Sequence, residues 1–461
     1  MFTSANLSGC HSVDHAARRT LLRAAAGWAG VTWWTGIAER LARAEERPEA
    51  RAGAEAGRTA SGAVEAAAAT GVTGRPARSV IMLWLQGGPS QLETFDPHPG
   101  TRIGGDSQAI ATTVDGVKIA SFYPQLAERM GRVSLVRSIV SKEGDHERAT
   151  YQGKTGYRPD PTLIHPSLGA VLCHQTSDNI EIPRHISIFP GLWGARGGYL
   201  GDQFDAFRTG DPVGPVPDIS LRVPEARFRQ RMDDLTNVVE PAFARGRLRN
   251  LDSGRTLHAT TLKNAQRMMS SDQLKAFNVR EAPADVREKF GDTPFGRGCL
   301  AAARLVQVGV RCVEVTLAGW DTHVSNHEGC RTQAAILDPA FAALLSFLET
   351  EQLLDDTIVL CGGEFGRTPR INPAGGRDHW PHGFTLAVAG GGFRGGQVIG
   401  ATSPEPRGLD RPSTDDIADP RTVADVHATV LRRLGVDFQT EHLTPIGRPM
   451  TFSEGRPIAS L

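Results

Sequence analysis

Ser79-Val80-Ile81-Met82-Leu83-Trp84-Leu85 forms a continuous apolar run, and Gln86-Gly87-Gly88-Pro89-Ser90 ends it. An apolar run without polar alternation, closed by a glycine turn, is typical of a strand buried on both faces of a parallel sheet. We therefore expect the folded unit to begin near Ser79 with a central strand, and to place polar residues just beyond the end of that strand.

Similar apolar runs recur along the chain, and each ends at glycine or polar residues. They lie at 133–136, 185–189, 310–317, 357–360 and 384–389. Helical patterns lie between several of them, at 294–308 and 333–352. Strands that alternate with helices predict an α/β fold with a doubly wound, mainly parallel sheet and helices on both faces. Residues 205–290 are polar and Arg-rich, and we expect a helical insertion there.

The composition fits an ordinary globular protein. The chain has 461 residues, 40% of them hydrophobic and 22% charged, which excludes a disordered chain, a coiled coil and a multi-span membrane protein. Lys+Arg and Asp+Glu both number 51, so the formal net charge is zero and gives no electrostatic reason to expect nucleic acid as a partner. None of the six cysteines forms a C-x-x-C pair, and with Cys10 in the leader at least one of the other five stays unpaired.

The N-terminus has the pattern of an export signal. Arg18-Arg19-Thr20-Leu21-Leu22 precedes an apolar stretch at 24–38, and Ala42-Arg43-Ala44 follows. This pattern predicts a signal over residues 1–44, and the double arginine resembles a twin-arginine signal. A membrane anchor is the alternative, but the stretch is short for a spanning helix. We expect a periplasmic or extracellular protein without a stable membrane span after cleavage, a low-complexity linker at 45–78 and one domain at 79–461.

Two short loops contain acid and histidine together. In open α/β sheets, ligands bind beyond the carboxyl ends of the strands. The loop after one predicted strand contains Asp321, His323 and His327, and the loop before another contains Asp378 and His379. Imidazole and carboxylate together suit zinc, manganese or iron. A hydrogen-bonded brace for glycine turns is the alternative, but two such loops beside consecutive strands favour a metal site.

A third segment, Gly362 to Arg370, follows another predicted strand. Glu364 is placed to bind a metal or to orient a ligand. Arg367 and Arg370 can bind phosphate, sulfate or carboxylate through bidentate hydrogen bonds. An Arg–Glu pair that fixes the loop is the alternative.

A fourth segment, Gly144-Asp145-His146-Glu147-Arg148, is also a candidate site. Here the alternative is purely structural, because Asp145 before a short helix is a good N-cap.

These motifs together resemble a known family. The twin-arginine leader, Leu-Gln-Gly-Gly-Pro-Ser-Gln-x-x-Thr-Phe-Asp-Pro, Gly-Trp-Asp-Thr-His, Gly-Glu-Phe-Gly-Arg-Thr-Pro and Gly-Arg-Asp-His-Trp-Pro resemble the exported bacterial domain-of-unknown-function family 1501 (DUF1501). The resemblance covers about residues 79–450. That family looks like a distant branch of the alkaline phosphatase/sulfatase superfamily. The resemblance implies an alkaline phosphatase-like sheet and a two-metal site that acts on phosphate or sulfate esters.

Carried onto this chain, the superfamily's site has gaps. The first strand ends at Gln86 where the superfamily has a metal-binding Asp, and no sulfatase Cys-x-Pro-x-Arg occurs. His146 stands where the resemblance places the nucleophile, with Thr150 as a substitute. Glu364 keeps the acid of the superfamily's Asp-His-Gly motif but not its histidine.

The remaining matches concern metal ligands. Asp321 with His323 or His327 looks like the superfamily's next acid–His pair, and His379 resembles the histidine that precedes the following strand. An alternative alignment places Asp378-His379 on the Asp-His-Gly motif. One metal position is then complete, while the second has lost two of its usual ligands.

The sequence therefore leads to two functional hypotheses. The first is an exported metal-dependent hydrolase of phosphate or sulfate esters, with an anionic small molecule or a sulfated or phosphorylated glycan as partner. Its cofactor is expected to be a divalent ion, namely zinc, manganese or calcium. The second is a non-catalytic binding or assembly protein on a degraded alkaline phosphatase-like fold. The retained acids and histidines favour the first.

Overall fold

The computed structural model describes residues 75–177, 180–191, 193–214, 216, 219–241, 258–409 and 413–461. The predicted export signal and nearly all of the predicted linker lie outside these ranges. Within them, none of the helices combines the length and apolar character that crossing a membrane requires.

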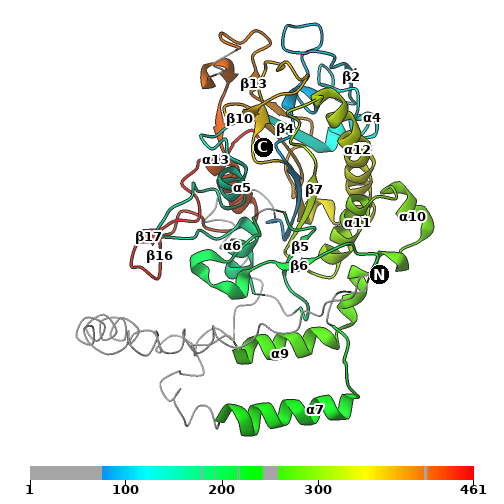
Figure 1. Ribbon diagram of the computed structural model, residues 1–461, viewed down its shortest axis with the longest axis vertical. Helices are drawn as coiled ribbons and strands as arrows, with labels where there is room; N and C mark the ends of the chain where they lie inside the picture. Colours follow the sequence, from blue (N-terminus) through cyan, green and yellow to red (C-terminus); the bar gives the residue numbers. More distant parts are fainter. Residues whose placement is uncertain are drawn as a thin grey trace, which may run out of the picture. The chain divides into compact units, whose positions relative to one another are not determined.

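One mixed sheet of nine strands organises the described chain (Figure 1). The strands are β1 (Ser79–Gln86), β4 (Val133–Val140), β5 (His185–Ile188), β6 (Phe207–Thr209), β7 (Cys312–Ala318), β8 (Thr357–Gly362), β11 (Phe384–Gly390), β12 (Val398–Ile399) and β15 (Arg421–Thr422). Their order is β12-β4-β11-β8-β1-β7-β5-β6, and β15 also pairs with β4. Only β11 runs antiparallel to its neighbours, β4 and β8. The predicted mainly parallel α/β sheet is confirmed.

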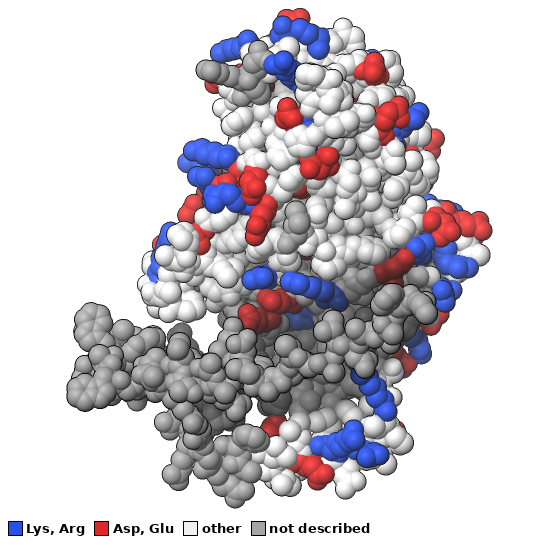
Figure 2. Space-filling view, viewed as in Figure 1, with Lys and Arg blue, Asp and Glu red and all other residues white. Residues whose placement is uncertain are grey.

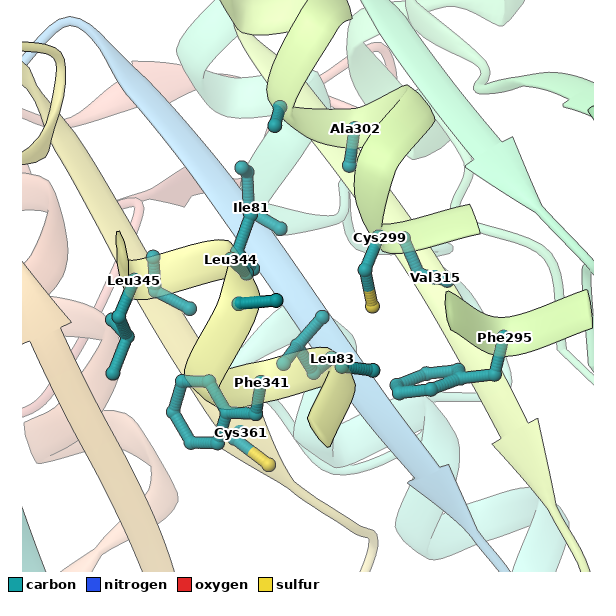
Figure 3. Close-up of a cluster of buried hydrophobic side chains, with 14 of the residues drawn as sticks. Ile81, Leu83, Phe295, Cys299, Ala302, Val315, Phe341, Leu344, Leu345 and Cys361 are labelled. Atoms are coloured by element: carbon teal, nitrogen blue, oxygen red, sulfur yellow. The ribbon is translucent and has the colours of Figure 1, made fainter. Parts of the chain in front are cut away.

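Strand β1 lies in the middle of the sheet and is apolar on both sides. Ile81 and Leu83 pack with residues of α11 (Pro294–Gln307) and α12 (Asn326–Thr350), as Figure 3 shows. The alternate residues, Met82 and Trp84 among them, pack on the other face with α6 (Leu168–Gln175) and α13 (Val423–Arg433). Since both faces of the sheet are covered by helices, the positions from Val80 to Leu85 are all apolar, as the unbroken run in the sequence indicated.

Helix α5 (His146–Thr155) lies on the same face as α6 and α13. Its start is fixed by Asp145, whose side chain accepts a hydrogen bond from Arg148 N at 3.1 Å. Its end is fixed by Gly156, which has a φ of 80°, a conformation that glycine adopts without strain. Lys154 near that end donates to Glu314 of β7 at 3.0 Å, and both side chains are buried. This ion pair fastens α5 to the sheet.

The predicted insertion at 205–290 is not wholly helical. It begins with β6, which extends the sheet by pairing parallel to β5. Helices follow from Glu225 onward: α7 (Glu225–Asp234), α9 (His258–Met269) and α10 (Ala284–Lys289). A three-residue edge strand is too short to produce an apolar pattern, so the sequence did not indicate it.

Smaller elements connect the main ones. They are α4 (Pro124–Ala127) and the strand pairs β2 (Ala109–Ala111) with β3 (Lys118–Ala120), β9 (Gly366–Arg367) with β10 (His379–Trp380), β13 (Ala401–Thr402) with β14 (Ile417–Ala418), and β16 (His442–Leu443) with β17 (Pro449–Met450). The five cysteines of the described chain are buried, and none of them forms a disulfide bond.

Candidate metal centre

The candidate site lies beyond the carboxyl ends of β1, β7 and β8. These three strands are neighbours and run parallel, so their ends meet at one edge of the sheet. The loop after β7 carries Asp321 and His323, and the loop after β8 carries Glu364. The start of α5 and the short strand β10 supply the other members of the site.

His146 is the first residue of α5 and is held from behind by Glu364. Its Nδ1 atom lies 2.8 Å from Glu364 Oε1, which also accepts a hydrogen bond from Gly87 N at 2.8 Å. Its Nε2 atom lies 3.4 Å from Asp321 Oδ2. The Glu364 side chain is fully buried, whereas the imidazole is partly exposed. The carboxylate therefore orients the imidazole, and Nε2 faces the site.

His379 occupies a similar position on β10, which pairs antiparallel with β9. Its Nδ1 atom donates to the carbonyl oxygen of Gly144 at 2.8 Å. Its Nε2 atom lies 3.4 Å from Asp321 Oδ1. The orienting group here is a backbone carbonyl.

His323 repeats the arrangement a third time. Its Nδ1 atom lies 2.8 Å from Asp378 Oδ1. Its Nε2 atom lies 3.1 Å from Asp321 Oδ1 and 3.0 Å from His379 Nε2. Three imidazoles thus direct their Nε2 atoms at one carboxylate, and each is held by an acceptor at Nδ1.

The hydrogen bonds determine where the ring protons lie. Carbonyl and carboxylate oxygens only accept, so each Nδ1 atom carries a proton and each neutral ring presents a lone pair at Nε2. Those lone pairs face the oxygens of Asp321. One atom each from His146, Asp321 and His379 lie within 4.8 Å of one another. Such a set of electron-pair donors fits a divalent cation, because ligands bound at about 2.1 Å to one ion lie about 3–4 Å apart.

The surroundings keep the two carboxyl groups ionised. Burial alone would raise the pKa of Asp321, but the hydrogen bond and charge of Arg367, together with His146 and His323, lower it to about 2. The hydrogen bond from His323 lowers the pKa of Asp378. Burial lowers the pKa of His379, which favours its neutral form. By contrast, the hydrogen bond to Glu364 raises the pKa of His146.

Arg367 does not take the position that we expected for an anion-binding residue. Its side chain is fully buried. The guanidinium donates to Asp321 Oδ1 at 2.6 Å, and to the carbonyl oxygens of Gly88 at 2.9 Å, Arg377 at 3.0 Å and Gly87. Its donors are thus directed at the protein, and we assign it the role of holding Asp321 and the loop after β1. Arg370 is exposed, and its proposed contact with an anion stays a prediction.

A second buried arginine supports the same loop. Arg377 donates to Glu93 Oε1 at 2.8 and 3.1 Å, and to the carbonyl oxygens of Pro369 at 2.7 Å and Ile103 at 2.8 Å. Glu93, the first acid after β1, is thus bound to Arg377 and does not belong to the histidine cluster. Sequence reasoning missed this pair, since its members lie 284 positions apart.

Two predicted site residues lie apart from the cluster. His327 is in the first turn of α12, and its ring packs edge-on against Phe122 with centroids 5.0 Å apart. Thr150 lies one turn after His146 on α5 and is buried, with 1% of its surface exposed. The structure therefore favours His323 over His327 as the partner of Asp321.

The other predicted acids and histidines meet at the cluster. Glu364 and Asp378 stand behind imidazoles as orienting groups. His146, expected as a nucleophile, lies among the cation-binding atoms. Sequence reasoning also missed the Gly144 carbonyl, because backbone atoms leave no signal in side-chain motifs.

Several solved structures resemble the chain at low identity. The PsFucS1 sulfatase from Pseudoalteromonas sp. is 12% identical with a TM-score of 0.36, over 87% of this chain and 73% of that chain. The lipoteichoic acid synthase LtaP from Listeria monocytogenes is 11% identical with a TM-score of 0.34, over 85% and 80%. A protein in the alkaline phosphatase superfamily from Vibrio parahaemolyticus is 11% identical with a TM-score of 0.34, over 87% and 80%.

No curated protein matches the sequence. The family described as "Protein of unknown function (DUF1501)" matches residues 77–461, from the start of the sheet to the last residue. The match covers every member of the histidine cluster. The chain therefore belongs to the DUF1501 family.

Proposed function

We propose that the protein is an exported metal-dependent hydrolase of phosphate or sulfate esters, with one divalent ion held by Asp321, His146, His323 and His379. One observation carries the proposal. Each of the three imidazoles is fixed by an acceptor at Nδ1 and directs Nε2 at the same carboxylate. Metal-binding histidines in proteins have this same outer hydrogen bond.

The donor atoms favour zinc among the expected ions. Three imidazole nitrogens and one carboxylate oxygen suit zinc or another transition metal. Calcium prefers six to eight oxygen ligands, which this cluster does not offer. When bound, the ion would supply Lewis acidity toward an ester oxygen.

The chain's own residues would prepare the site for an anionic ester. Asp321 and His323 are about half exposed, so a ligand can reach them from solvent. Helix α5 begins at His146, and the N-terminus of a helix favours a nearby negative charge. Arg370 lies on the exposed part of the loop that leads from β9 to β10. The ester class itself rests on the family resemblance, and sulfated or phosphorylated glycans are the macromolecular substrates to test.

A non-catalytic binding role is the second candidate, and the first strand favours it. β1 ends at Gln86, and Glu93 is bound to Arg377, so the loop after β1 offers no free acid for a second ion.

Positive and negative side chains are interspersed on the face in Figure 2, in keeping with the net charge of zero.

Metal analysis and ester hydrolysis distinguish these candidates. The protein is purified from the periplasm of the bacterium that produces it. Its metal content is compared with that of the variants His323→Gln and His379→Gln. His327→Gln is the matched control, because that histidine lies outside the cluster. We expect one tightly bound ion in the wild type and in the control, and no bound ion in the two cluster variants. We also expect the wild type and the control to hydrolyse aryl phosphates or sulfates. A metal-free, folded wild type contradicts the hydrolase. Bound metal without turnover of either ester class favours the binding role.

Export is tested separately. Replacing Arg18 and Arg19 by lysine is expected to keep the protein in the cytoplasm, as shown by cell fractionation. An unchanged periplasmic fraction would contradict a twin-arginine route.

A further inference from the structure

Of the three groups that orient the imidazoles of the cluster, Asp378 is the exposed one. The Glu364 side chain behind His146 is fully buried, and the group behind His379 is a backbone carbonyl. The Asp378 side chain behind His323 is 58% exposed. An exposed carboxylate that makes one hydrogen bond keeps much of its rotamer freedom, so a second contact is needed to hold it in one position.

Asn372 makes that second contact. Its Nδ2 atom donates to Asp378 Oδ1 at 3.3 Å, the same oxygen that accepts from His323 Nδ1 at 2.8 Å. The amide nitrogen also donates to the carbonyl oxygen of His323 at 3.0 Å. Glu364 is held in a similar way, since its Oε1 atom accepts from an imidazole and from Gly87 N. Asn372 thus contacts both the backbone of a cluster histidine and the carboxylate that orients its ring.

The backbone around Asn372 determines which way its amide faces. Its Oδ1 atom accepts hydrogen bonds from Ala374 N at 3.0 Å and from Gly376 N at 2.9 Å. A backbone N–H group only donates, so the amide oxygen must face this turn. The amide nitrogen then faces the two acceptors, which are the carboxylate and the His323 carbonyl oxygen. The turn therefore fixes the orientation that the contact with the carboxylate requires.

The turn at 372–376 lies directly against the loop that carries His323. Backbone hydrogen bonds run from Ser325 N at 3.1 Å and from Asn326 N at 2.9 Å to carbonyl oxygens of the turn. At Gly376 an added Cβ atom would lie 1.8 Å from the His323 carbonyl oxygen. Because the two loops are joined in this way, the amide keeps a fixed place beside the histidine and its carboxylate.

We propose that Asn372 is a positioning residue of the candidate metal centre. It holds the Asp378 carboxylate against His323 Nδ1 and thereby directs Nε2 of that ring into the cluster. Asn372 acts through Asp378 and is not itself one of the cation-binding residues. The effect on metal binding rests on the proposed function, whereas the contact with Asp378 exists without an ion.

Asn372→Ser tests the role through metal affinity. A serine oxygen can still accept from the backbone of the turn, but the side chain is too short to reach the carboxylate. We expect the dissociation constant for zinc to rise about fivefold. In a protein that already carries Asp378→Ala, the same substitution should raise it by less than about twofold, because the carboxylate is no longer there to be held.

Asn278→Ser is the matched control. Asn278 Oδ1 also accepts from a backbone N–H group, that of Arg280 at 3.2 Å, and its Nδ2 atom donates to Glu281 at 3.0 Å. We expect this variant to bind zinc as tightly as the wild type. Equal losses of affinity from Asn372→Ser with and without the Asp378 side chain overturn the positioning role, since a merely structural effect does not depend on that carboxylate.

Asn372→Asp tests the same contact without any metal. Aspartate keeps the oxygen that closes the turn and replaces the donor by a charged acceptor, so it repels the Asp378 carboxylate. In metal-free crystals of this variant we expect Asp378 to lie beyond hydrogen-bonding distance of His323 Nδ1. A variant that keeps this contact overturns the proposal, and the experiment decides it even if Asn372→Ser does not fold. A wild type that binds no zinc contradicts the proposed function, while the crystals still decide whether Asn372 holds Asp378.

Discussion

His323 Nε2 lies 3.0 Å from His379 Nε2, and neither atom carries a proton while its ring is neutral. The Nδ1 protons are already used, one toward Asp378 and one toward the Gly144 carbonyl, each at 2.8 Å. Two lone pairs at this distance repel each other unless a cation lies between them. Either a proton or a metal ion supplies that cation, and metal-binding histidines have the same kind of acceptor behind their rings.

Asp378→Asn is expected to weaken metal binding while leaving the fold intact. The amide removes the negative charge behind His323, so we expect the dissociation constant to rise about tenfold. Asp378 is more than half exposed, so the free energy of unfolding of the metal-free protein should change by less than about 0.5 kcal/mol. Titration against a chromophoric chelator measures the affinity. Glu328→Gln is the control, an exposed acid that is paired with Arg331. Equal affinities for Asp378→Asn and Glu328→Gln would contradict the role of Asp378.

Arg367→Met and Arg370→Met should differ strongly in stability, although the two residues lie three positions apart. Arg367 is buried and binds Asp321 at 2.6 Å, so its loss leaves carbonyl and carboxylate oxygens unpaired. We expect a loss of about 3–5 kcal/mol in the free energy of unfolding. Arg370 is exposed, and its replacement should cost no more than about 0.5 kcal/mol. Urea denaturation measures both values.

The two arginine variants should also differ in kinetics. If Arg370 binds the anionic part of an ester, Arg370→Met raises KM and leaves stability unchanged. A stable Arg367→Met protein with a raised KM would instead support the direct contact between Arg367 and an anion that the sequence suggested.

The place of the site was predictable from the sequence because it follows from strand direction. Apolar runs closed by glycine turns indicated parallel strands, and parallel strands bring their carboxyl ends together. Asp321 and Glu364, which follow the parallel strands β7 and β8, could thus be assigned to one edge before their positions were known. His379 precedes β11 and reaches the same edge because β11 runs antiparallel, which its apolar run did not indicate. The strand β1 was predictable for a different reason. Helices cover both of its faces, so its sequence is an unbroken apolar run.

The roles within the site were not predictable, because they depend on where a helix begins and which side chain is buried. The sequence pattern predicted a helix over 333–352, whereas α12 begins at Asn326. His327 is therefore helical and turns toward Phe122, while His323 remains in the loop. Likewise, nothing in the spacing of Arg367 and Arg370 indicates which guanidinium the fold encloses.

Lys154→Met is expected to cost more stability than removal of the whole ion pair. Lys154 Nζ donates to Glu314 Oε2 and to the carbonyl oxygen of Trp193, both at 3.0 Å. The single variant leaves a buried carboxylate without its cation, so the free energy of unfolding should fall by about 3–5 kcal/mol. The double variant Lys154→Met/Glu314→Gln removes the charge too and should regain part of that loss. Chemical denaturation of both variants tests this, and a double variant less stable than the single one would contradict it.

His427 is expected to make stability depend on pH. Its ring is buried and donates to the Gly153 carbonyl at 2.9 Å, and burial lowers its pKa from 6.5 to about 4. Between these values the unfolded chain binds a proton that the folded chain does not. The free energy of unfolding therefore has its full value above about pH 6.5. It falls as the pH is lowered toward 4, and this histidine accounts for a loss of roughly 3 kcal/mol in total.

His427→Gln isolates this contribution from those of the other histidines. Glutamine can still donate to the Gly153 carbonyl but does not titrate, so the variant should lose less stability than the wild type on acidification. The free energy of unfolding is measured by urea denaturation from about pH 7.5 to about pH 4.5, and the two curves are subtracted. His165, whose pKa is also lowered to about 4 by burial, contributes equally to both proteins and cancels. A difference that stays constant across this pH range would mean that His427 titrates in the folded chain as it does in the unfolded one.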